Sequence, residues 1–70
     1  MKIEDMSNFE LSNAIDEFVR GERERAILKR RLIDLIHFEP LAEEFDLSLP
    51  QIKRVVHKSQ EQLFKGIERK

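Results

Sequence analysis

Apolar residues recur along the whole chain at helical spacing, and no segment shows the strict alternation of apolar and polar residues that is typical of a strand. The first stripe consists of four residues at i, i+3, i+4 and i+7, namely Leu11, Ala14, Ile15 and Phe18. Ser7 and Glu10 precede it as a capping box, in which each side chain accepts a hydrogen bond from a backbone N–H. We therefore expect a helix that begins at Ser7 and is ended by Gly21, since glycine accepts a left-handed backbone.

A second helix is predicted from about Glu22 to Ile36. Five of its apolar residues can share one broad face: Ile27, Leu28, Leu32, Leu35 and Ile36. Ile33 falls outside that face and is assigned to a second contact surface. Lys29 and Arg30 are expected to face solvent or a ligand.

A third, short helix is predicted from about Glu39 to Phe45, with Pro40 in its first turn, where the missing N–H costs nothing. Asp46 follows in a turn, because aspartate tolerates a left-handed backbone better than most residues. Ser48 and Gln51 form a second capping box, which starts a fourth helix. Its inward face is predicted to consist of Ile52, Val55, Val56, Ser59 and Leu63. One of the two adjacent valines is expected to be only partly buried.

These elements predict an all-α fold of four helices in a single domain, residues 1–70. Residues 1–21 supply the N-terminal helix. Residues 22–70 contain a C-terminal helix-turn-helix, because a short helix, three turn residues and a longer helix match the length of that motif. Seventy residues allow only a thin core. Four of the five phenylalanines are assigned to this core. Phe64 follows the core-facing Leu63 and therefore points outward.

Charge is nearly balanced over the chain, at a net −1, but it is unevenly distributed. Residues 1–47 carry seven Lys or Arg against twelve Asp or Glu, whereas residues 48–70 carry six against two. A basic C-terminal third on an acidic body favours a polyanionic partner. The sequence has no cysteine, no apolar run of the ~20 residues that span a bilayer, and an acidic start unlike a signal peptide. We therefore expect a cytoplasmic protein without a membrane partner.

The start of the fourth helix supplies most of the predicted DNA contacts, because the second helix of a helix-turn-helix enters the major groove with its first turns. Arg54 can donate two hydrogen bonds to a guanine, with Lys53 beside it at base edges. Lys58 and His57 are expected to hold phosphates. The complete predicted set is Leu49, Pro50, Gln51, Lys53, Arg54, His57 and Lys58, with Arg30 on the second helix as a further phosphate contact.

Three stretches carry a family resemblance: ERERAIL opens the second helix, LAEEFDLS covers the third helix and its turn, and QIKRVVHKSQEQL lies in the fourth helix. Over Glu22–Ile67 the chain resembles region four of bacterial sigma factors, and small phage and prophage proteins carry similar free-standing domains. That domain reads the −35 promoter element and contacts RNA polymerase. By resemblance, its base-reading positions fall on Leu49, Pro50, Lys53 and Arg54. The first two are apolar where primary sigma factors carry charged residues, so the resemblance implies DNA binding without the −35 sequence preference.

An alternative function is a protein-interaction module that binds RNA polymerase or a sigma factor without reading DNA, and the apolar Leu49 and Pro50 favour it. A homodimer is a further possibility, because one such module reads only a few base pairs. Its interface would be the N-terminal helix or the region of Phe64. His37 and His57 lie on different elements without a third ligand, so neither a metal nor another cofactor is expected. The sequence offers no nucleophile–base pair or glycine-rich phosphate loop, and we do not expect an enzyme.

Overall fold

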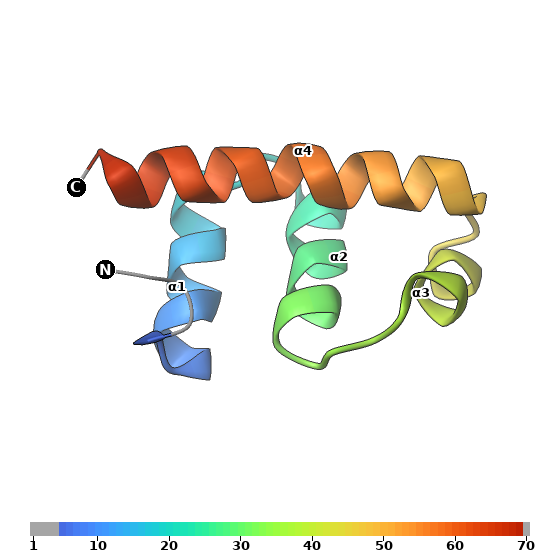
Figure 1. The fold of residues 1–70 in the computed structure, drawn as a ribbon, viewed down its shortest axis with the longest axis horizontal. Coiled ribbons are helices and arrows are strands. Elements are labelled where there is room, and N and C mark those ends of the chain that lie inside the picture. The colour runs from blue at the N-terminus through green and yellow to red at the C-terminus, as the bar shows by residue number, and fades with distance from the viewer. Residues whose placement is uncertain (1–4, 70) are drawn as a thin grey trace.

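The computed structural model describes residues 5–69, so both ends of the predicted domain, residues 1–4 and Lys70, lie outside the described residues. The described part contains four helices and no strand, which confirms the predicted all-α class: α1 (Asn8–Phe18), α2 (Glu22–Leu32), α3 (Phe38–Glu44) and α4 (Leu49–Glu68). Figure 1 shows α4 along the long axis, with α1, α2 and α3 following one another along one side of it. The principal extents are 34 × 18 × 17 Å. At about 1.5 Å per residue, α4 runs nearly the whole length.

The core lies between α4 and the three shorter helices. Four residues of α4 form its buried stripe: Ile52, Val56, Ser59 and Leu63. The other helices bury Leu11, Ala14 and Ile15 from α1, Ile27 and Leu28 from α2, and Leu41 and Ala42 from α3. Val55 is only half-buried, as expected for one of the two valines. Because α1, α2 and α3 all pack on one side of α4, its opposite side is exposed along its length. None of the helices within residues 5–69 has the length and apolar character needed to cross a bilayer.

Both predicted capping boxes are present. In α1 the Glu10 N–H donates to Ser7 Oγ at 3.1 Å, and the Ser7 N–H donates to Glu10 Oε1 at 3.2 Å. In α4 the Gln51 N–H donates to Ser48 Oγ at 3.3 Å, and the Ser48 N–H donates to Gln51 Oε1 at 2.9 Å. These bonds satisfy backbone donors that lack a partner within the helix, and they fix the first residue of each helix.

The connection between α3 and α4 also follows the prediction. Asp46 has a φ of 55°, in the left-handed region. Its N–H donates to the Glu43 carbonyl at 3.2 Å, and the Leu47 N–H donates to the Ala42 carbonyl at 2.9 Å. This pair of bonds is a Schellman motif, which closes the end of a helix. The chain therefore turns sharply after α3 and enters α4 at the Ser48 cap.

Some helix boundaries differ from the predicted ones. α1 ends at Phe18 rather than at Gly21, because the backbone is already extended at Val19, with a φ of −94° and a ψ of 130°. Gly21 does have a positive φ of 91°, but it occupies the position that precedes α2. α3 begins at Phe38 and ends at Glu44, in each case one residue earlier than expected.

The end of α2 is the largest correction. The helix stops at Leu32 instead of Ile36, because Leu35 takes a φ of 58° and the Ile36 N–H turns back to the Arg30 carbonyl at 3.1 Å. Leu35 is 71% exposed, so its assignment to the apolar face is wrong. The turn instead lets Ile33 and Ile36 pack against the edge of the core while the chain moves across to α3.

The phenylalanines divide between the edge of the core and the surface. Three of them are partly buried against the core: Phe18, Phe38 and Phe45. Phe64 is 43% exposed, which confirms its predicted outward position. Phe9 is 75% exposed, and its assignment to the core is wrong. It lies two residues before Leu11, about 160° around the helix from the buried stripe that Leu11 begins.

Candidate nucleic-acid interface

Four predicted contact residues lie together on the outward face of α4, close to its start. They are Lys53, Arg54, His57 and Lys58, and all four are exposed, as predicted. The same turns bury Ile52 and Val56, which anchor this half of α4 in the core. Residues four apart are neighbours on a helix, so Lys53 lies next to His57 and Arg54 lies next to Lys58, in two adjacent rows.

This surface has almost no internal partners. The side chains of Arg54, His57 and Lys58 make no hydrogen bond or ion pair with any residue from 5 to 69. Lys53 has one weak contact, since its Nζ lies 5.8 Å from the centroid of the Phe38 ring. That distance is at the outer limit of a cation–π interaction. The head groups are therefore available to a ligand.

The first turn of α4 carries three further residues of the predicted set. Leu49 is half-buried and packs against the edge of the core, so it is less exposed than the other residues of the predicted set on α4. Pro50 and Gln51 are exposed. The Gln51 side-chain oxygen is occupied by the Ser48 N–H, which leaves its amide N–H groups as donors.

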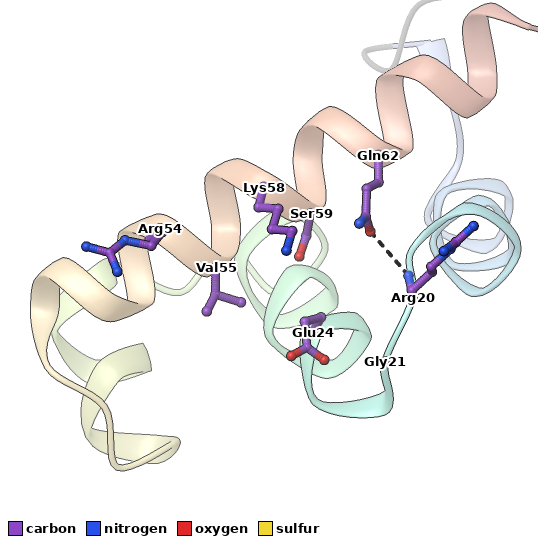
Figure 2. A pocket seen from close by; sticks show the side chains of 8 residues that line it. All are labelled: Arg20, Gly21, Glu24, Arg54, Val55, Lys58, Ser59 and Gln62. Atoms are coloured by element: carbon purple, nitrogen blue, oxygen red, sulfur yellow. Dashed lines mark hydrogen bonds between the residues drawn. The ribbon is translucent and has the colours of Figure 1, made fainter.

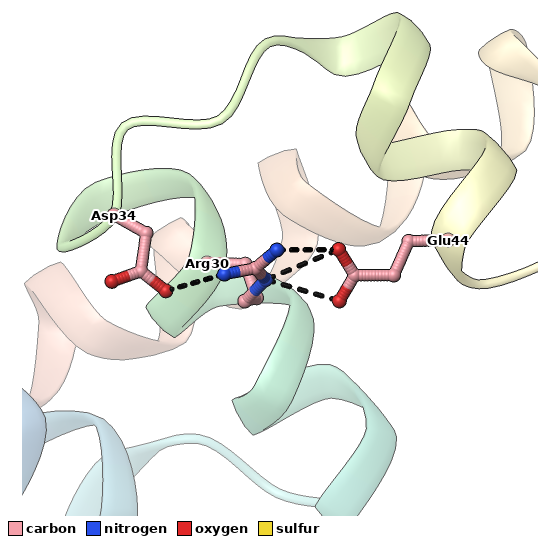
Figure 3. A network of polar contacts seen from close by, with 3 residues as sticks. All are labelled: Arg30, Asp34 and Glu44. Atoms are coloured by element: carbon pink, nitrogen blue, oxygen red, sulfur yellow. Dashed lines mark hydrogen bonds and ion pairs between the residues drawn. The ribbon is translucent and has the colours of Figure 1, made fainter.

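Arg30, which was predicted to contact a phosphate, is already paired with two carboxylates in the structure. Its Nε donates to Glu44 Oε2 at 3.0 Å and its Nη2 donates to Glu44 Oε1 at 2.7 Å. Its Nη1 donates to Asp34 Oδ2 at 2.9 Å (Figure 3). The hydrogen bonds that Arg30 donates to Glu44, and secondarily to Asp34, raise the pKa of Arg30 above its ordinary value. Arg30 is therefore a charged link between α2 and α3, with two carboxylates already beside it.

A groove beside α4 adds an arginine that the sequence did not single out. Arg20, in the connection between α1 and α2, lines this groove together with Arg54 and Lys58 (Figure 2). The Arg20 N–H donates to Gln62 Oε1 at 3.2 Å, which holds the connection against α4. Glu24 lies on the opposite wall. Apolar periodicity gives no signal for Arg20, because its position depends on how α1 packs against a helix that follows much later in the chain.

Residues 5–69 contain no group of three or more His, Cys, Asp or Glu side chains that could hold a metal ion. Comparisons with protein-family models, with curated protein sequences and with solved structures gave no match. The distinctive feature of the surface is the group of unpaired cations on α4, and attraction of a polyanion is the chemistry that such a group supports.

Proposed function

We propose that this chain is a sequence-specific DNA-binding transcriptional regulator, in which α3, its turn and α4 act as a helix-turn-helix. Residues 49–65 of α4 would be the recognition helix in the major groove. The sharp turn at Asp46, the capped start of α4 and its exposed cationic face support this function. The resemblance of Glu22–Ile67 to sigma-factor region four, which is carried by these same stretches of sequence, points to the same function and to a small regulator of the phage or prophage type.

In the proposed complex, the first turns of α4 meet base edges and the walls of the groove. Arg54 donates two parallel hydrogen bonds to O6 and N7 of a guanine, a contact that the point charge of a lysine does not reproduce. Lys53 lies beside it and acts at base edges. Lys58 and His57 follow one turn later and hold phosphates, which fixes the register of the helix on the duplex.

The observation that carries this proposal is the lack of internal partners for the α4 cations. A cation that serves the fold is held by nearby acceptors, as Arg30 is held by Glu44 and Asp34. Arg54 and Lys58 have no such acceptor within residues 5–69. Like charges kept together on one helix face repel one another, and a polyanion relieves that repulsion.

Titration of the double variant Lys53→Ala/Arg54→Ala with duplex DNA tests the proposal. Loss of the Arg54 contact alone is expected to weaken binding to a selected duplex by about 1–3 kcal/mol. Discrimination between selected and random duplexes should also fall, because base-edge contacts carry it. The control is Lys29→Ala, which removes a cation already paired with Asp16 at 2.7 Å. If the double variant binds both duplexes as tightly as the unaltered protein at ~100 mM salt, the proposal is wrong.

The salt dependence of binding gives a second measurement on the same variants. Five cationic groups that neutralise nearby phosphate charge, namely Lys53, Arg54, His57, Lys58 and Arg30, would give a slope of about −4 to −5 for log K against log salt concentration. Without Arg30, the cations at the start of α4, which are Lys53, Arg54 and Lys58 with or without His57, give a slope of about −3 to −4. A slope near zero would exclude a DNA-backbone contact by this helix.

A single recognition helix reads only a few base pairs, so specific regulation requires a second copy or a larger partner. A homodimer on two half-sites would place two chains on each duplex, and light scattering would show a mass that rises with concentration. The alternative is the protein-interaction module. Folded protein that binds no duplex in a salt-dependent manner, yet is retained by purified RNA polymerase or a sigma factor, would establish it. The partial burial of Leu49 removes one of the two residues that favoured that alternative.

A further inference from the structure

We infer that the second half of α4, together with the α1–α2 connection, extends the DNA contact along the sugar–phosphate backbone beyond the recognition turns. The inference rests on the proposed DNA-binding function. It concerns a line of cations on one side of the molecule, here called the basic row, in which the exposed Glu61 is the one acidic side chain between Lys58 and Lys65. The basic row consists of Arg54, Lys58 and Lys65 on α4 and Arg69, which caps the end of α4, with Arg20 beside them.

The members of the basic row on α4 and its cap share one side of the helix. They are separated by four, seven and four residues, and these spacings return a side chain to nearly the same face of an α-helix. All four are exposed, and none forms an ion pair with another residue of 5–69. In the sequence, Lys65 and Arg69 are two of the six cations of residues 48–70. The structure places them in line with Arg54 and Lys58.

Arg20 is held next to this row by the packing of α1. Gly66 has no side chain, and a Cβ there would overlap the Phe18 ring, so the end of α1 approaches α4 closely at this point. The Arg20 N–H donates to Gln62 of α4 at 3.2 Å (Figure 2). From the other side, Arg25 Nε donates to the Val19 carbonyl at 2.7 Å. Two side-chain hydrogen bonds thus fix the connection that carries Arg20, and Arg20 lines one groove with Arg54 and another with Lys65.

The length of the basic row indicates where a duplex would meet it. Fifteen residues separate Arg54 from Arg69, which corresponds to about 22 Å along a helix axis. The major groove of B-DNA is only about 12 Å wide. If Arg54 lies in the groove, Lys65 and Arg69 lie over the flanking backbone, where their charge meets phosphates rather than bases.

The composition of this side of α4 favours nucleic acid over an acidic protein as the partner. Protein interfaces concentrate their binding energy in buried aromatic and aliphatic anchors. Between Arg54 and Arg69, the side of α4 that carries the row has no exposed apolar residue, and Phe64 points to a different side of the helix. Glu24 and Glu17 also line the grooves beside the row. Glu61 is exposed on the row's own side of α4, seven residues after Arg54 and four before Lys65, so it lowers the net charge between the two pairs of cations.

The test is the double variant Lys65→Ala/Arg69→Ala in the full chain, measured with selected and random duplexes across a salt series. With Arg20 included, the unaltered protein should show a slope of about −5 to −6, rather than the −3 to −4 expected from the recognition turns alone. The variant should lower that slope by about 2. It should weaken binding to both duplexes by the same factor, so that discrimination is retained. Arg23→Ala/Lys29→Ala removes the same charge from α2 and should change the slope much less.

The outcomes separate this inference from the proposed function. If Lys65→Ala/Arg69→Ala binds as the unaltered protein does while Lys53→Ala/Arg54→Ala loses binding, the extended contact is wrong and the recognition turns stand. If neither variant changes binding, both proposals fail. If Lys65→Ala/Arg69→Ala leaves DNA binding intact but loses retention by purified RNA polymerase, the row serves a protein partner and the inference is overturned. Circular dichroism of each variant checks that the helices are unchanged.

Discussion

Two runs of cationic residues occur in the chain, and the fold treats them in opposite ways. The first is Lys29, Arg30 and Arg31 near the end of α2, and the second begins with Lys53 and Arg54 on α4. The α2 run is the denser of the two in the sequence. In the structure its head groups are engaged by other parts of the protein, whereas among residues 5–69 the head groups of the α4 run have only the weak contact of Lys53 with Phe38.

Each cation of the α2 run connects a different element to α2. Lys29 Nζ lies 2.7 Å from the Asp16 carboxylate of α1. Arg31 Nη1 donates to the Ile36 carbonyl at 3.1 Å, and its guanidinium lies 4.4 Å from the centroid of the Phe38 ring. Arg30 joins α2 to α3, as described above. The run therefore holds α1, α3 and the α2–α3 connection around α2.

The difference shows that the location of a helix, more than its number of cations, decides whether those cations are free to bind a ligand. α2 lies between α1 and α3 (Figure 1). Both neighbours present carboxylates to it, Asp16 from α1 and Glu44 from α3. The outward side of α4 faces no other helix. If this explanation is correct, changes in the α2 run should act mainly on stability, and changes on α4 should act mainly on binding.

The largest expected effect on stability within the α2 run is that of Arg31→Ala. The change removes a hydrogen bond to a carbonyl and a close cation–π contact, and should lower the free energy of unfolding by about 1–2 kcal/mol. Urea denaturation monitored by circular dichroism measures it. Arg23→Ala is the control on the same helix, because the ion pair of Arg23 is long, at 3.9 Å, and exposed. Reduced DNA affinity with unchanged stability in Arg31→Ala would break the distinction between the two runs.

The two connections that follow α2 and α3 show how far the fold could be predicted from the sequence. Each contains a non-glycine residue with a positive φ, Leu35 at 58° and Asp46 at 55°. Asp46 was predictable, because aspartate tolerates this conformation and Ser48 signals a new helix two residues later. Leu35 carries no such signal. Its conformation follows from the need to bring α3 against α2 and α4, and helical periodicity alone continued the helix through it.

The same limit applies to the candidate site. The exposure of Lys53 and Arg54 follows from the apolar stripe of their own helix, so the sequence predicted it correctly. The pairing of Arg30 with Glu44 joins residues 14 apart, and the contact of Arg20 with Gln62 joins residues 42 apart. Local pattern contains no information on such contacts. They decide which cations are occupied and which form the basic row.

A smaller effect is expected from Leu35→Asn, which tests the turn that brings α3 beside the α2 run. A left-handed backbone costs a branched residue such as leucine about 1–2 kcal/mol, and asparagine tolerates it better. Leu35 is exposed, so little packing is lost. We expect the free energy of unfolding to rise by about 0.5–1 kcal/mol. Asp46→Asn is the matched control and should be nearly neutral. A lower stability for Leu35→Asn would mean that Leu35 has a packing role that its exposure hides.

The smallest effect is expected from Glu44→Gln, which asks whether pairing or position keeps Arg30 away from DNA. The change removes the carboxylate charge opposite Arg30, while Asp34 still accepts from Nη1 at 2.9 Å. We expect the salt slope of DNA binding to be unchanged, because Arg30 faces α3 rather than the outward side of α4. Glu43→Gln changes the net charge equally on the same helix and corrects for any general effect. A slope steeper by about one in Glu44→Gln alone would show that Arg30 reaches a phosphate once released. In that case the ion pair with Glu44, and not the position of α2, would be the reason why Arg30 does not bind DNA while the α4 cations do.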